Sequence, residues 1–487
     1  MELVHREAPY DSEVQRLRER ARTSLGEESR TRRLVCASAV LYALVLSAAS
    51  TVHYLAYRSP RLDLGDMVQA VWATSHGHVL QVTSLAGIEM SRLGTHADPF
   101  LALFAPLWRI WPSPLMLLTA QAVAIAAGAF PVYWLARKHL RTERAAAHLV
   151  FAYLLFPATQ FNAFKVHPVS FAVPLLLFAI WFLDEGRLLP FAVVALLAAS
   201  TKEEIPLAVG CLGIWYAVRK GRRLAGLTIF ALGLAGTLAD FLVVIPHFSP
   251  SGTDPFAGRY AAVGGTPRGM LHTVVTDPAA FVHAAATWHK ALYLVLVFVP
   301  WLGLWALEPI LLLGAFPDLV INLLSSKPEQ TALQYQYTAG IVPFLVAASI
   351  LGAARVRRHP DRVTFYALAG AASMALFSPV YFAAGDIRAA LPSNPVHAAK
   401  AHALGLIPGS ARVSASNELA GHLSARRHIV LFPYLGDARF VVVDLDDRTI
   451  VDRAGYLRTV RALDSNPRWR LVYSAHGVQV LKKRMSQ

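Results

Sequence analysis

Two carboxylates, Asp63 and Asp66, follow directly after the first long apolar segment of the chain. If Asp63 opens a helix, Asp66 lies one turn further on and Gln69 extends the same face. A second polar group, His96 with Asp98, stands just before the next apolar run. Acid and imidazole groups at the edge of a membrane domain are the usual groups for proton transfer. Because Asp63 equally suits the N-cap of a short interfacial helix, these residues alone leave both roles open.

The run Lys202-Glu203-Glu204 is the most informative of the other polar groups, because it lies between apolar segments too short to hide three charges in lipid. Charges at such a depth are costly and normally face a cavity or each other. The run therefore belongs either to a polar cavity or to a local ion pair at a helix turn. His167, Gln336 and Tyr337 also end apolar runs, although His167 alone needs no function and Tyr337 fits an aromatic belt. Together these groups predict a polar cavity that can hold an anionic headgroup.

The composition assigns these groups to a membrane protein. Of the 487 residues, 55% are hydrophobic and 16% are charged, whereas soluble domains are about a quarter charged. The net charge of +15 falls in short clusters between apolar runs, which is typical of cytoplasmic loops and anionic lipid and not of nucleic-acid binding. Cys36 and Cys211 both lie inside apolar runs and indicate neither a disulfide framework nor a metal site.

About eleven apolar runs predict transmembrane helices, and several of them have the length of roughly 20 residues that a bilayer requires. They are Leu34–Tyr57, Leu115–Leu135, Ala145–Phe161, Val169–Leu183, Leu188–Ser200, Ile205–Val218, Leu224–Ile245, 289–307, Pro309–Leu324, Ala339–Ala354 and Val363–Ala383. The basic clusters 137–144, 219–223 and 355–362 all fall on one side of these spans, which predicts that this side is cytoplasmic.

The predicted organisation has three parts. Residues 1–33 form a basic cytoplasmic tail, and residues 34–384 form the transmembrane domain with an outer loop at 58–112. From 385 to 487 short β-rich runs alternate with helical patterns, which predicts a small extracytoplasmic α/β domain. The apolar run 440–444 is typical of a buried parallel strand, and 454–464 has a helical pattern. This last part has no glycine-rich phosphate fingerprint, and we interpret it as a lid or docking module. With this topology all the polar groups named above lie at the outer ends of spans.

The motif Leu62-Asp63-Leu64-Gly65, continuing through Gln69-Ala70-Val71-Trp72, resembles the signature of a membrane-protein family known as domain of unknown function 2079. The same resemblance includes His96-Ala97-Asp98-Pro99, Lys202-Glu203-Glu204, Asn322-Leu323-Leu324-Ser325, Gln336-Tyr337, Ile341-Val342-Pro343-Phe344 and Val413-Ser414-Ala415-Ser416-Asn417, in the family's order. It covers the chain from about residue 52 to the C-terminus. That family is similar to the GT-C glycosyltransferases, such as the protein mannosyltransferases and the aminoarabinose transferases.

The resemblance implies a mainly helical, GT-C-like membrane enzyme that transfers a sugar from a polyprenyl-phosphate-linked donor to an extracytoplasmic acceptor. An acidic residue in the first outer loop serves the GT-C enzymes, and Asp63 matches it. By the same resemblance Lys202, with His167, would hold the carrier phosphate, and Glu203 and Glu204 would orient the lysine or contact sugar hydroxyls. The chain departs from the family at Asp66, where an apolar or aromatic residue is more common.

The two acids therefore leave two arrangements open. Asp63 and Asp66 form either a base with its partner or, together with His96 and Asp98, a divalent-metal site. The expected substrate-binding set is Gln69, His96, Asp98, His167, Lys202, Glu203, Glu204, Gln336 and Tyr337.

Two other functions fit a membrane protein of this kind, namely a transporter or flippase for a lipid-linked or anionic solute, and a membrane scaffold. Transporters usually place charges near the bilayer midplane and contain internal repeats, whereas here the charges gather at one face and no repeat is found. A scaffold leaves the run 202–204 unexplained. The expected location is the cytoplasmic membrane, and the expected partners are membrane lipid and the lipid-linked donor, without nucleic acid.

Overall fold

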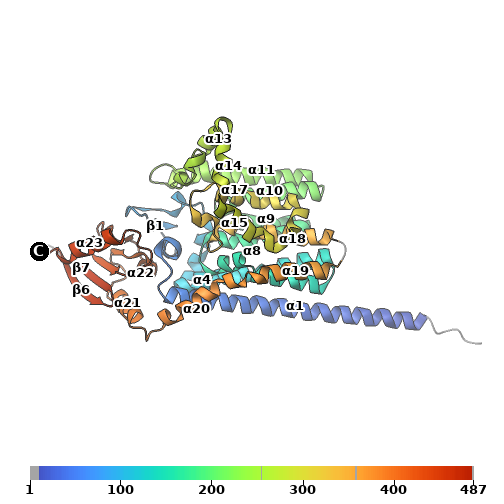
Figure 1. Cartoon of the computed structure of the whole chain (residues 1–487), viewed down its shortest axis with the longest axis horizontal. Helices are drawn as coiled ribbons and strands as arrows, with labels where there is room; N and C mark the ends of the chain where they lie inside the picture. The colour runs from blue at the N-terminus through green and yellow to red at the C-terminus, as the bar shows by residue number, and fades with distance from the viewer. Residues whose placement is uncertain (1–9, 254, 357–358, 485–487) are drawn as a thin grey trace, which may run out of the picture.

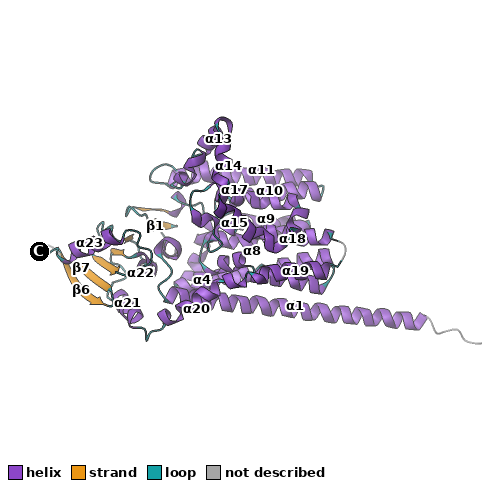
Figure 2. Cartoon of the chain, viewed as in Figure 1, coloured by secondary structure: helices purple, strands orange, loops and turns teal. Residues whose placement is uncertain are grey.

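The structure, a computed structural model, describes residues 10–253, 255–356 and 359–484. The rest of the chain lies outside the described residues, including Arg357 and Arg358 of the predicted basic cluster and the first nine residues of the predicted tail. A bundle of helices makes up most of the molecule, and a small sheet domain lies beyond one end of it (Figures 1 and 2). The long helix α1 (Tyr10–Leu55) begins in the polar N-terminal sequence and extends well past the other end of the bundle (Figure 1).

Most helices of the bundle follow one another with short connections, but a long segment separates α11 from α15. They are α4 (Pro114–Ala127), α5 (Ala129–Leu140), α6 (Glu143–Leu155), α7 (Pro157–Phe164), α8 (Ala172–Asp184), α9 (Leu188–Ala199), α10 (Ile205–Arg219), α11 (Arg223–Ala239), α15 (Trp288–Phe298), α16 (Pro309–Leu312), α17 (Phe316–Leu324), α18 (Val342–Arg355), α19 (Pro360–Ser373) and α20 (Pro379–Ala390). Their core is built from fully buried apolar residues, among them Tyr153, Phe156, Trp301 and Phe344.

Several apolar runs that the sequence assigns to single spans are broken in the structure. The predicted span 145–161 stops where Pro157 begins α7, and the predicted span 309–324 is divided between α16 and α17. Proline lacks the N–H that a helix interior needs, so it starts a new helix. Among the described residues, five helices are long and apolar enough to cross a membrane, or six if the bent pair 279–285 and 288–301 is one span. The predicted count of about eleven is therefore not confirmed.

Helices α10 and α11 form a tight antiparallel hairpin that positions one part of the site. A Cβ atom at Gly213 would lie 2.3 Å from the carbonyl oxygen of Gly226, so only glycine permits this backbone approach. At the other end of the hairpin, Thr237 donates to the carbonyl oxygen of Glu203 and accepts from the N–H of Leu207. The start of α10, where the run 202–204 ends, is thus held by α11.

Buried carboxylates hold the basic residues at the end of the bundle opposite the sheet domain. Glu308 is 2% exposed and accepts from Arg219, Arg355 and the indole N–H of Trp215. Asp184 pairs in the same way with Lys138, His139 and Lys220. Part of the positive charge that predicts a cytoplasmic face is therefore tied to specific buried acids.

Two segments lie outside the helical bundle, and we call them the first and second outer segments; the first faces the sheet domain, whereas the second lies at the top of the molecule in Figure 1. The first contains the π-helical turn η1 (Arg61–Gly65), α2 (Asp66–Ser75), the antiparallel pair β1 (Gln81–Thr83) and β2 (Glu89–Ser91), η2 (Arg92–Gly94), η3 (Pro99–Phe104) and α3 (Ala105–Ile110). The second contains η5 (Asp240–Val244), α12 (Ile245–Phe248), η6 (Ala257–Val263), α13 (Pro267–Thr276) and α14 (Ala279–Ala285). The two meet at Gly94, where a Cβ atom would lie 2.3 Å from the carbonyl oxygen of Phe248.

The C-terminal domain is a five-stranded mixed sheet with three helices. Its elements are α21 (Pro395–Gly405), β3 (Val413–Ala415), α22 (Asn417–His422), β4 (Ile429–Leu431), β5 (Phe440–Asp444), α23 (Arg453–Asp464), β6 (Trp469–Ala475) and β7 (Val478–Lys483). The strand order is β4-β3-β5-β7-β6, with β3 parallel to β4 and β5, and β7 antiparallel to β5 and β6. Strand β5 is buried throughout and coincides with the apolar run that predicts a central strand.

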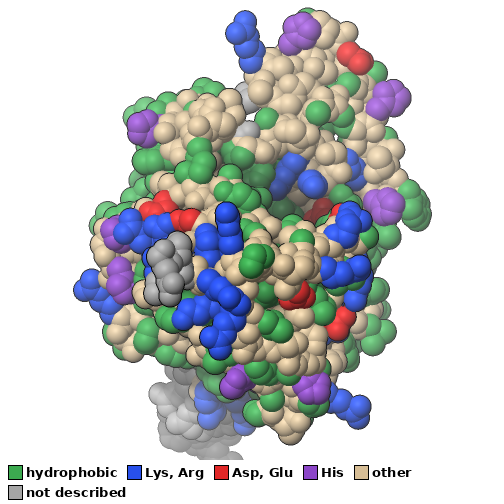
Figure 3. All heavy atoms as spheres, turned by 90° about the vertical axis from the view of Figure 1, so that its left-hand side faces the viewer, with side chains coloured by type: hydrophobic (Ala, Val, Ile, Leu, Met, Phe, Trp, Pro, Cys, Tyr) green, Lys and Arg blue, Asp and Glu red, His purple; other side chains and the backbone are tan. Residues whose placement is uncertain are grey.

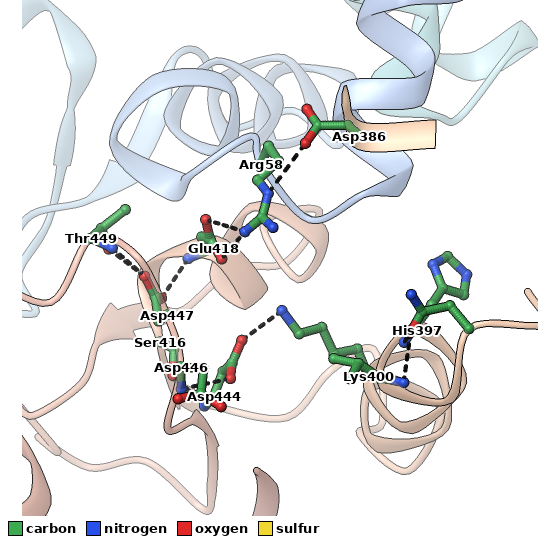
Figure 4. Close-up of polar contacts among 12 residues, drawn as sticks. Arg58, Asp386, His397, Lys400, Ser416, Glu418, Asp444, Asp446, Asp447 and Thr449 are labelled. Atoms are coloured by element: carbon green, nitrogen blue, oxygen red, sulfur yellow. Dashed lines mark hydrogen bonds and ion pairs between the residues drawn. The ribbon is translucent and has the colours of Figure 1, made fainter. Parts of the chain in front are cut away.

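Charge is segregated along this sheet. The residues at the carboxyl ends of β3 and β5 include Glu418, Asp444 and Asp447; Glu418 faces Arg58, whereas Asp444 pairs with Lys400 of α21 (Figure 4). The opposite edge carries exposed Arg412, Arg439, Lys482 and Lys483, and blue side chains gather on the face toward the viewer in Figure 3. The acidic end of the domain is therefore the end that meets the first outer segment.

Candidate functional site

Asp63 lies in η1, a short turn that directly follows Pro60. Its Oδ1 is 4.0 Å from Nε2 of His167, and 32% of the Asp63 side chain is exposed. Burial raises the pKa of the Asp63 carboxyl above its ordinary value; the charge of Lys165 opposes this rise and that of Asp66 adds to it. A carboxylate with increased proton affinity and an open side is suited to accept a proton from a bound molecule.

His167 stands beside Asp63 at the start of the 3-10 turn η4 (Pro168–Phe171). Its pKa is lowered well below the ordinary value by burial and by nearby cations, first Lys165 and then Arg92. Its Nε2 is buried and has no hydrogen-bond partner among the described residues. The imidazole is therefore neutral at physiological pH and presents a free ring nitrogen next to Asp63.

Gln121 of α4 holds the segment that carries His167 and Lys165. Its amide nitrogen donates to the carbonyl oxygens of Asn162 and Lys165, and its Oε1 accepts from the backbone N–H of His167 at 2.9 Å. Gln121 is fully buried. Because one side chain satisfies three backbone groups, this segment keeps a fixed conformation although it is not helical.

Lys165 supplies a cation that no carboxylate neutralises. Its Nζ lies 5.0 Å from the ring centroid of Tyr335 and makes no ion pair with another described residue. Its charge acts on both Asp63 and His167. The candidate site thus combines a carboxylate, a neutral imidazole and an ammonium group that has no ion-pair partner in the described part of the chain.

The run 202–204 forms the second half of the site. Lys202 is ion-paired with Glu204, and its Nζ lies 5.8 Å from the ring of Tyr337. Although burial acts in the opposite direction, the charges of Glu204 and Glu203 raise the pKa of Lys202. Burial also raises the pKa of Glu204 well above its ordinary value. The lysine is therefore a buried cation in a group with an excess of acid.

Glu203 and His96 connect this run to the first outer segment. Nδ1 of His96 is 3.0 Å from Oε1 of Glu203, and the backbone N–H of Ala97 donates to Oε2. Although burial acts against it, His96 holds the pKa of Glu203 well below its usual range. The ring of His96 also stacks on Phe256 of the second outer segment, with 4.8 Å between ring centroids.

Three predicted site residues have partners that turn them away from this group. Asp66 lies 3.4 Å from the guanidinium of Arg61, and Asp98 forms a buried ion pair with Arg92 at 2.7 Å. Gln69 exchanges two hydrogen bonds with Thr83 and donates to backbone carbonyl oxygens of the C-terminal domain. These residues support the outer segment, whereas Asp63, His167 and the run 202–204 make up the candidate site.

Gln336 and Tyr337 lie in the 3-10 turn η11 (Gln336–Thr338). Oε1 of Gln336 is buried without a partner among the described residues, while the carbonyl oxygen of Tyr337 accepts from Asn322. Buried polar atoms without protein partners are uncommon and are usually satisfied by water or a ligand. Gln336 is therefore available to a bound molecule in a way that Gln69 is not.

The four candidate metal ligands do not form one ligand set. Asp66, His96 and Asp98 are each paired with a different side chain, namely Arg61, Glu203 and Arg92. In the described ranges, no group of three or more His, Cys, Asp and Glu residues is placed to hold a metal ion. These residues do not fit a divalent metal, and the function below is derived without one.

Sequence reasoning missed four residues of this site: Gln121, Lys165, Asp318 and Tyr335. Asp318 accepts the N–H of Gly340 at 2.7 Å and lies within hydrogen-bonding reach of Glu204. A single carboxylate inside an apolar run is itself a signal of function, so Asp318 could have been found. Lys165 gave no such signal, because its nearness to Asp63 depends on the path of the chain around Gln121.

Two solved structures of ArnT have the same architecture as this chain. ArnT from Cupriavidus metallidurans bound to undecaprenyl phosphate has a TM-score of 0.54 at 13% identity, over 92% of this chain and 97% of that chain. Apo ArnT from the same organism has a TM-score of 0.50 at 14% identity, over 91% and 98%. The chain therefore has the fold of ArnT, a GT-C glycosyltransferase.

The sequence itself assigns the chain to a family. The model of the family described as predicted membrane protein (DUF2079) matches residues 53–452, and the chain belongs to that family. This confirms the resemblance drawn from the motifs, and the match extends from the end of α1 through strand β5. None of the curated proteins matches the chain.

Proposed function

We propose that this protein is a GT-C-type glycosyltransferase that transfers a sugar from a polyprenyl-phosphate donor to an extracytoplasmic acceptor. The observation that carries the proposal is Asp63, an accessible carboxylate with raised pKa, next to the unneutralised ammonium group of Lys165. The shared fold with an enzyme solved with undecaprenyl phosphate supports the choice of donor. The eleven-span topology and the cytoplasmic membrane belong to the same proposal.

The reaction needs a base and a cation that holds the leaving group. The acceptor hydroxyl oxygen attacks the anomeric carbon of the donor sugar, and Asp63 takes the hydroxyl proton. The bond between that carbon and the phosphate oxygen breaks, and the polyprenyl phosphate leaves with the bonding electrons. Lys165 stabilises the phosphate charge as it develops. Gln336 is placed to bind a sugar hydroxyl, and Lys202 stays a second candidate for the phosphate.

The direct test is transfer by the purified full-length chain in lipid nanodiscs. A radiolabelled undecaprenyl-phosphate sugar should lose its label to an acceptor fraction prepared from the outer cell envelope. Lipid that copurifies with the chain should include a polyprenyl-phosphate sugar when analysed by mass spectrometry. If the chain moves the labelled lipid between leaflets without cleaving it, the protein is a flippase and the proposal is wrong.

Lys165 should contribute more to phosphate binding than Lys202. Replacing Lys165 by Met should weaken binding of undecaprenyl phosphate about 10- to 100-fold, because a hydrogen bond to a charged group is worth about 1.5–3 kcal/mol. Replacing Lys202 by Met should mainly destabilise the fold, because Glu204 loses its buried partner. Native mass spectrometry in nanodiscs measures the binding.

The control for this pair is Lys327, an exposed lysine on the loop that leads to Tyr335. Lys327→Met should bind undecaprenyl phosphate like the wild type. Equal binding by Lys165→Met and Lys327→Met would exclude Lys165 as the phosphate ligand, and loss of binding in a stable Lys202→Met would assign that role to Lys202.

The orientation can be measured by cysteine labelling in whole cells. In a background with Cys36 and Cys211 replaced by Ala, Arg144→Cys should be protected from an impermeant maleimide and Gly258→Cys should react. The expectation follows from the basic clusters, because Arg144 adjoins the basic stretch before α6 and Gly258 lies in the second outer segment. Reaction at Arg144→Cys alone would reverse the topology and place the site in the cytoplasm.

A further inference from the structure

The turn that carries Asp63 is capped by a residue from the other end of the chain. Oδ1 of Asn417 accepts the backbone N–H groups of Arg61 at 3.0 Å and Leu62 at 3.4 Å. The preceding residue, Pro60, provides no side-chain cap. The first N–H groups of a helical turn have no partner within the turn and need such an acceptor. Asn417 supplies it across 356 residues of sequence.

Helix α22, which begins with Asn417, is packed directly on this turn. A Cβ atom at Gly65 would lie 2.5 Å from Oγ of Ser424, and one at Gly421 would lie 2.1 Å from the carbonyl oxygen of Ser59. At Gly421 no side chain fits between the two backbones, and at Gly65 a side chain would meet the hydroxyl of Ser424, just after α22. The turn and α22 are therefore in close contact.

The residue next to Asn417 holds the start of the same segment. Glu418 is 3.3 Å from the guanidinium of Arg58, which also pairs with Asp386 of α20, as Figure 4 shows. Glu418 is itself fixed by its backbone N–H, which donates to Asp447. Two consecutive residues of α22 thus hold both Arg58 and the turn that follows it.

The contacts of Asn417 and Glu418 with the segment 58–62 fill the crevice where open α/β sheets usually bind ligands. Strand β3 has β4 on one side and β5 on the other, so the crevice at their carboxyl ends is a topological switch point. Asn417 and Glu418 follow β3, and Asp447 follows β5. In this chain the crevice receives Arg58 from the membrane domain.

We propose that Asn417 is a positioning residue that sets the direction of the Asp63 carboxylate, which makes the C-terminal domain part of the active site. The inference rests on the proposed function insofar as Asp63 is the base. The cap holds the N–H groups of Arg61 and Leu62, directly before Asp63, so its loss lets the turn unwind where the carboxylate is attached. Asp63 then moves away from His167 and becomes more hydrated.

The test compares two asparagines with the same chemistry. Oδ1 of Asn394 accepts the N–H groups of Val396 and His397 at the start of α21, so Asn394→Ala removes an equivalent cap from a helix that does not carry Asp63. The variants Asn417→Ala, Asn417→Asp and Asn394→Ala are prepared as full-length chains in nanodiscs. Amide hydrogen exchange is measured over residues 58–66, and the pH midpoint of carbodiimide labelling at Asp63 is measured by mass spectrometry.

In Asn417→Ala, exchange in 61–65 should accelerate at least tenfold, and the labelling midpoint of Asp63 should move to lower pH as the carboxyl gains water. Asn394→Ala should change neither quantity. Asn417→Asp keeps the acceptor and should restore slow exchange. If Asn417→Ala does not fold, Asn417→Ser, which retains a shorter acceptor, replaces it.

Unchanged exchange and an unchanged midpoint in Asn417→Ala would overturn the inference. Faster exchange throughout α18 as well as in 61–65 would also overturn the inference, because it would show a general loss of stability. Sugar transfer is measured on the same samples and should fall with the shift in midpoint. If the midpoint shifts but the wild type transfers no sugar, the proposed function fails and the positioning of Asp63 by Asn417 stands.

Discussion

Asp63→Asn should reduce sugar transfer by about 10²–10⁴-fold, which is the contribution of a well-placed general base. The amide has the shape of the carboxylate but cannot take a proton, so folding and binding of undecaprenyl phosphate should persist. The wild-type rate should decline as the pH is lowered, because Asp63 acts as a base only when it is deprotonated. Since burial raises the pKa of Asp63, this decline should begin at a higher pH than for an ordinary carboxyl. Transfer and lipid binding are measured on the same nanodisc samples.

Asp66→Asn is the matched control, since Asp66 is the other acid of the motif and pairs with Arg61. Asp66→Asn should reduce the rate of sugar transfer less than tenfold. If Asp66→Asn abolishes transfer and Asp63→Asn does not, the base is the second acid. If neither variant changes transfer, the motif has a structural role and the enzyme proposal fails.

Gln121→Leu should cause the largest structural loss in the site. The change leaves three backbone groups of the segment 162–167 without partners, and each unsatisfied buried group costs about 1–3 kcal/mol. We expect a loss of about 3–5 kcal/mol in the free energy of unfolding, because some of these groups will find new partners. Unfolding is followed by titration with SDS in mixed micelles, and binding of undecaprenyl phosphate should fall as Lys165 loses its place.

Gln160→Leu provides the comparison, because Gln160 is also a buried glutamine of this region but donates only one hydrogen bond, to the carbonyl oxygen of Leu154. Gln160→Leu should lower the free energy of unfolding by about 1–2 kcal/mol and leave the binding of undecaprenyl phosphate close to normal. If the two variants lose the same free energy of unfolding, the three hydrogen bonds of Gln121 do not stabilise the protein more than the single bond of Gln160.

The sequence predicted the parts of the site whose signal is local. Asp63 follows the first apolar run, and the run 202–204 stands out because charges are rare between apolar segments. Strand β5 and helix α23 also fall where their patterns predicted them. In each case the signal is a polarity contrast over fewer than about ten residues, and burial in lipid or in a sheet produces such a contrast directly.

Contacts between distant segments could not be predicted in this way. Gln69 was expected to extend the face of Asp63, but its amide is used by Thr83 and by the backbone at 426–427. Asp63 lies inside the π-helical turn η1, and α2 begins directly after this turn at Asp66, whose carboxylate pairs with Arg61. The count of about eleven spans is also not confirmed, because hydropathy does not show where prolines divide an apolar run.

The bonds between Thr83 and the 426–429 segment have a consequence for biogenesis. Gln69 and Thr83 are made when less than a fifth of the chain has been synthesised, yet their partners at 426–429 belong to its last eighth. A nascent chain can therefore insert its helices long before η1 acquires its cap and its neighbours. Asp63, the base under the proposed function, takes its final place only when translation is complete, so we expect a prematurely terminated chain to enter the membrane without transferring sugar.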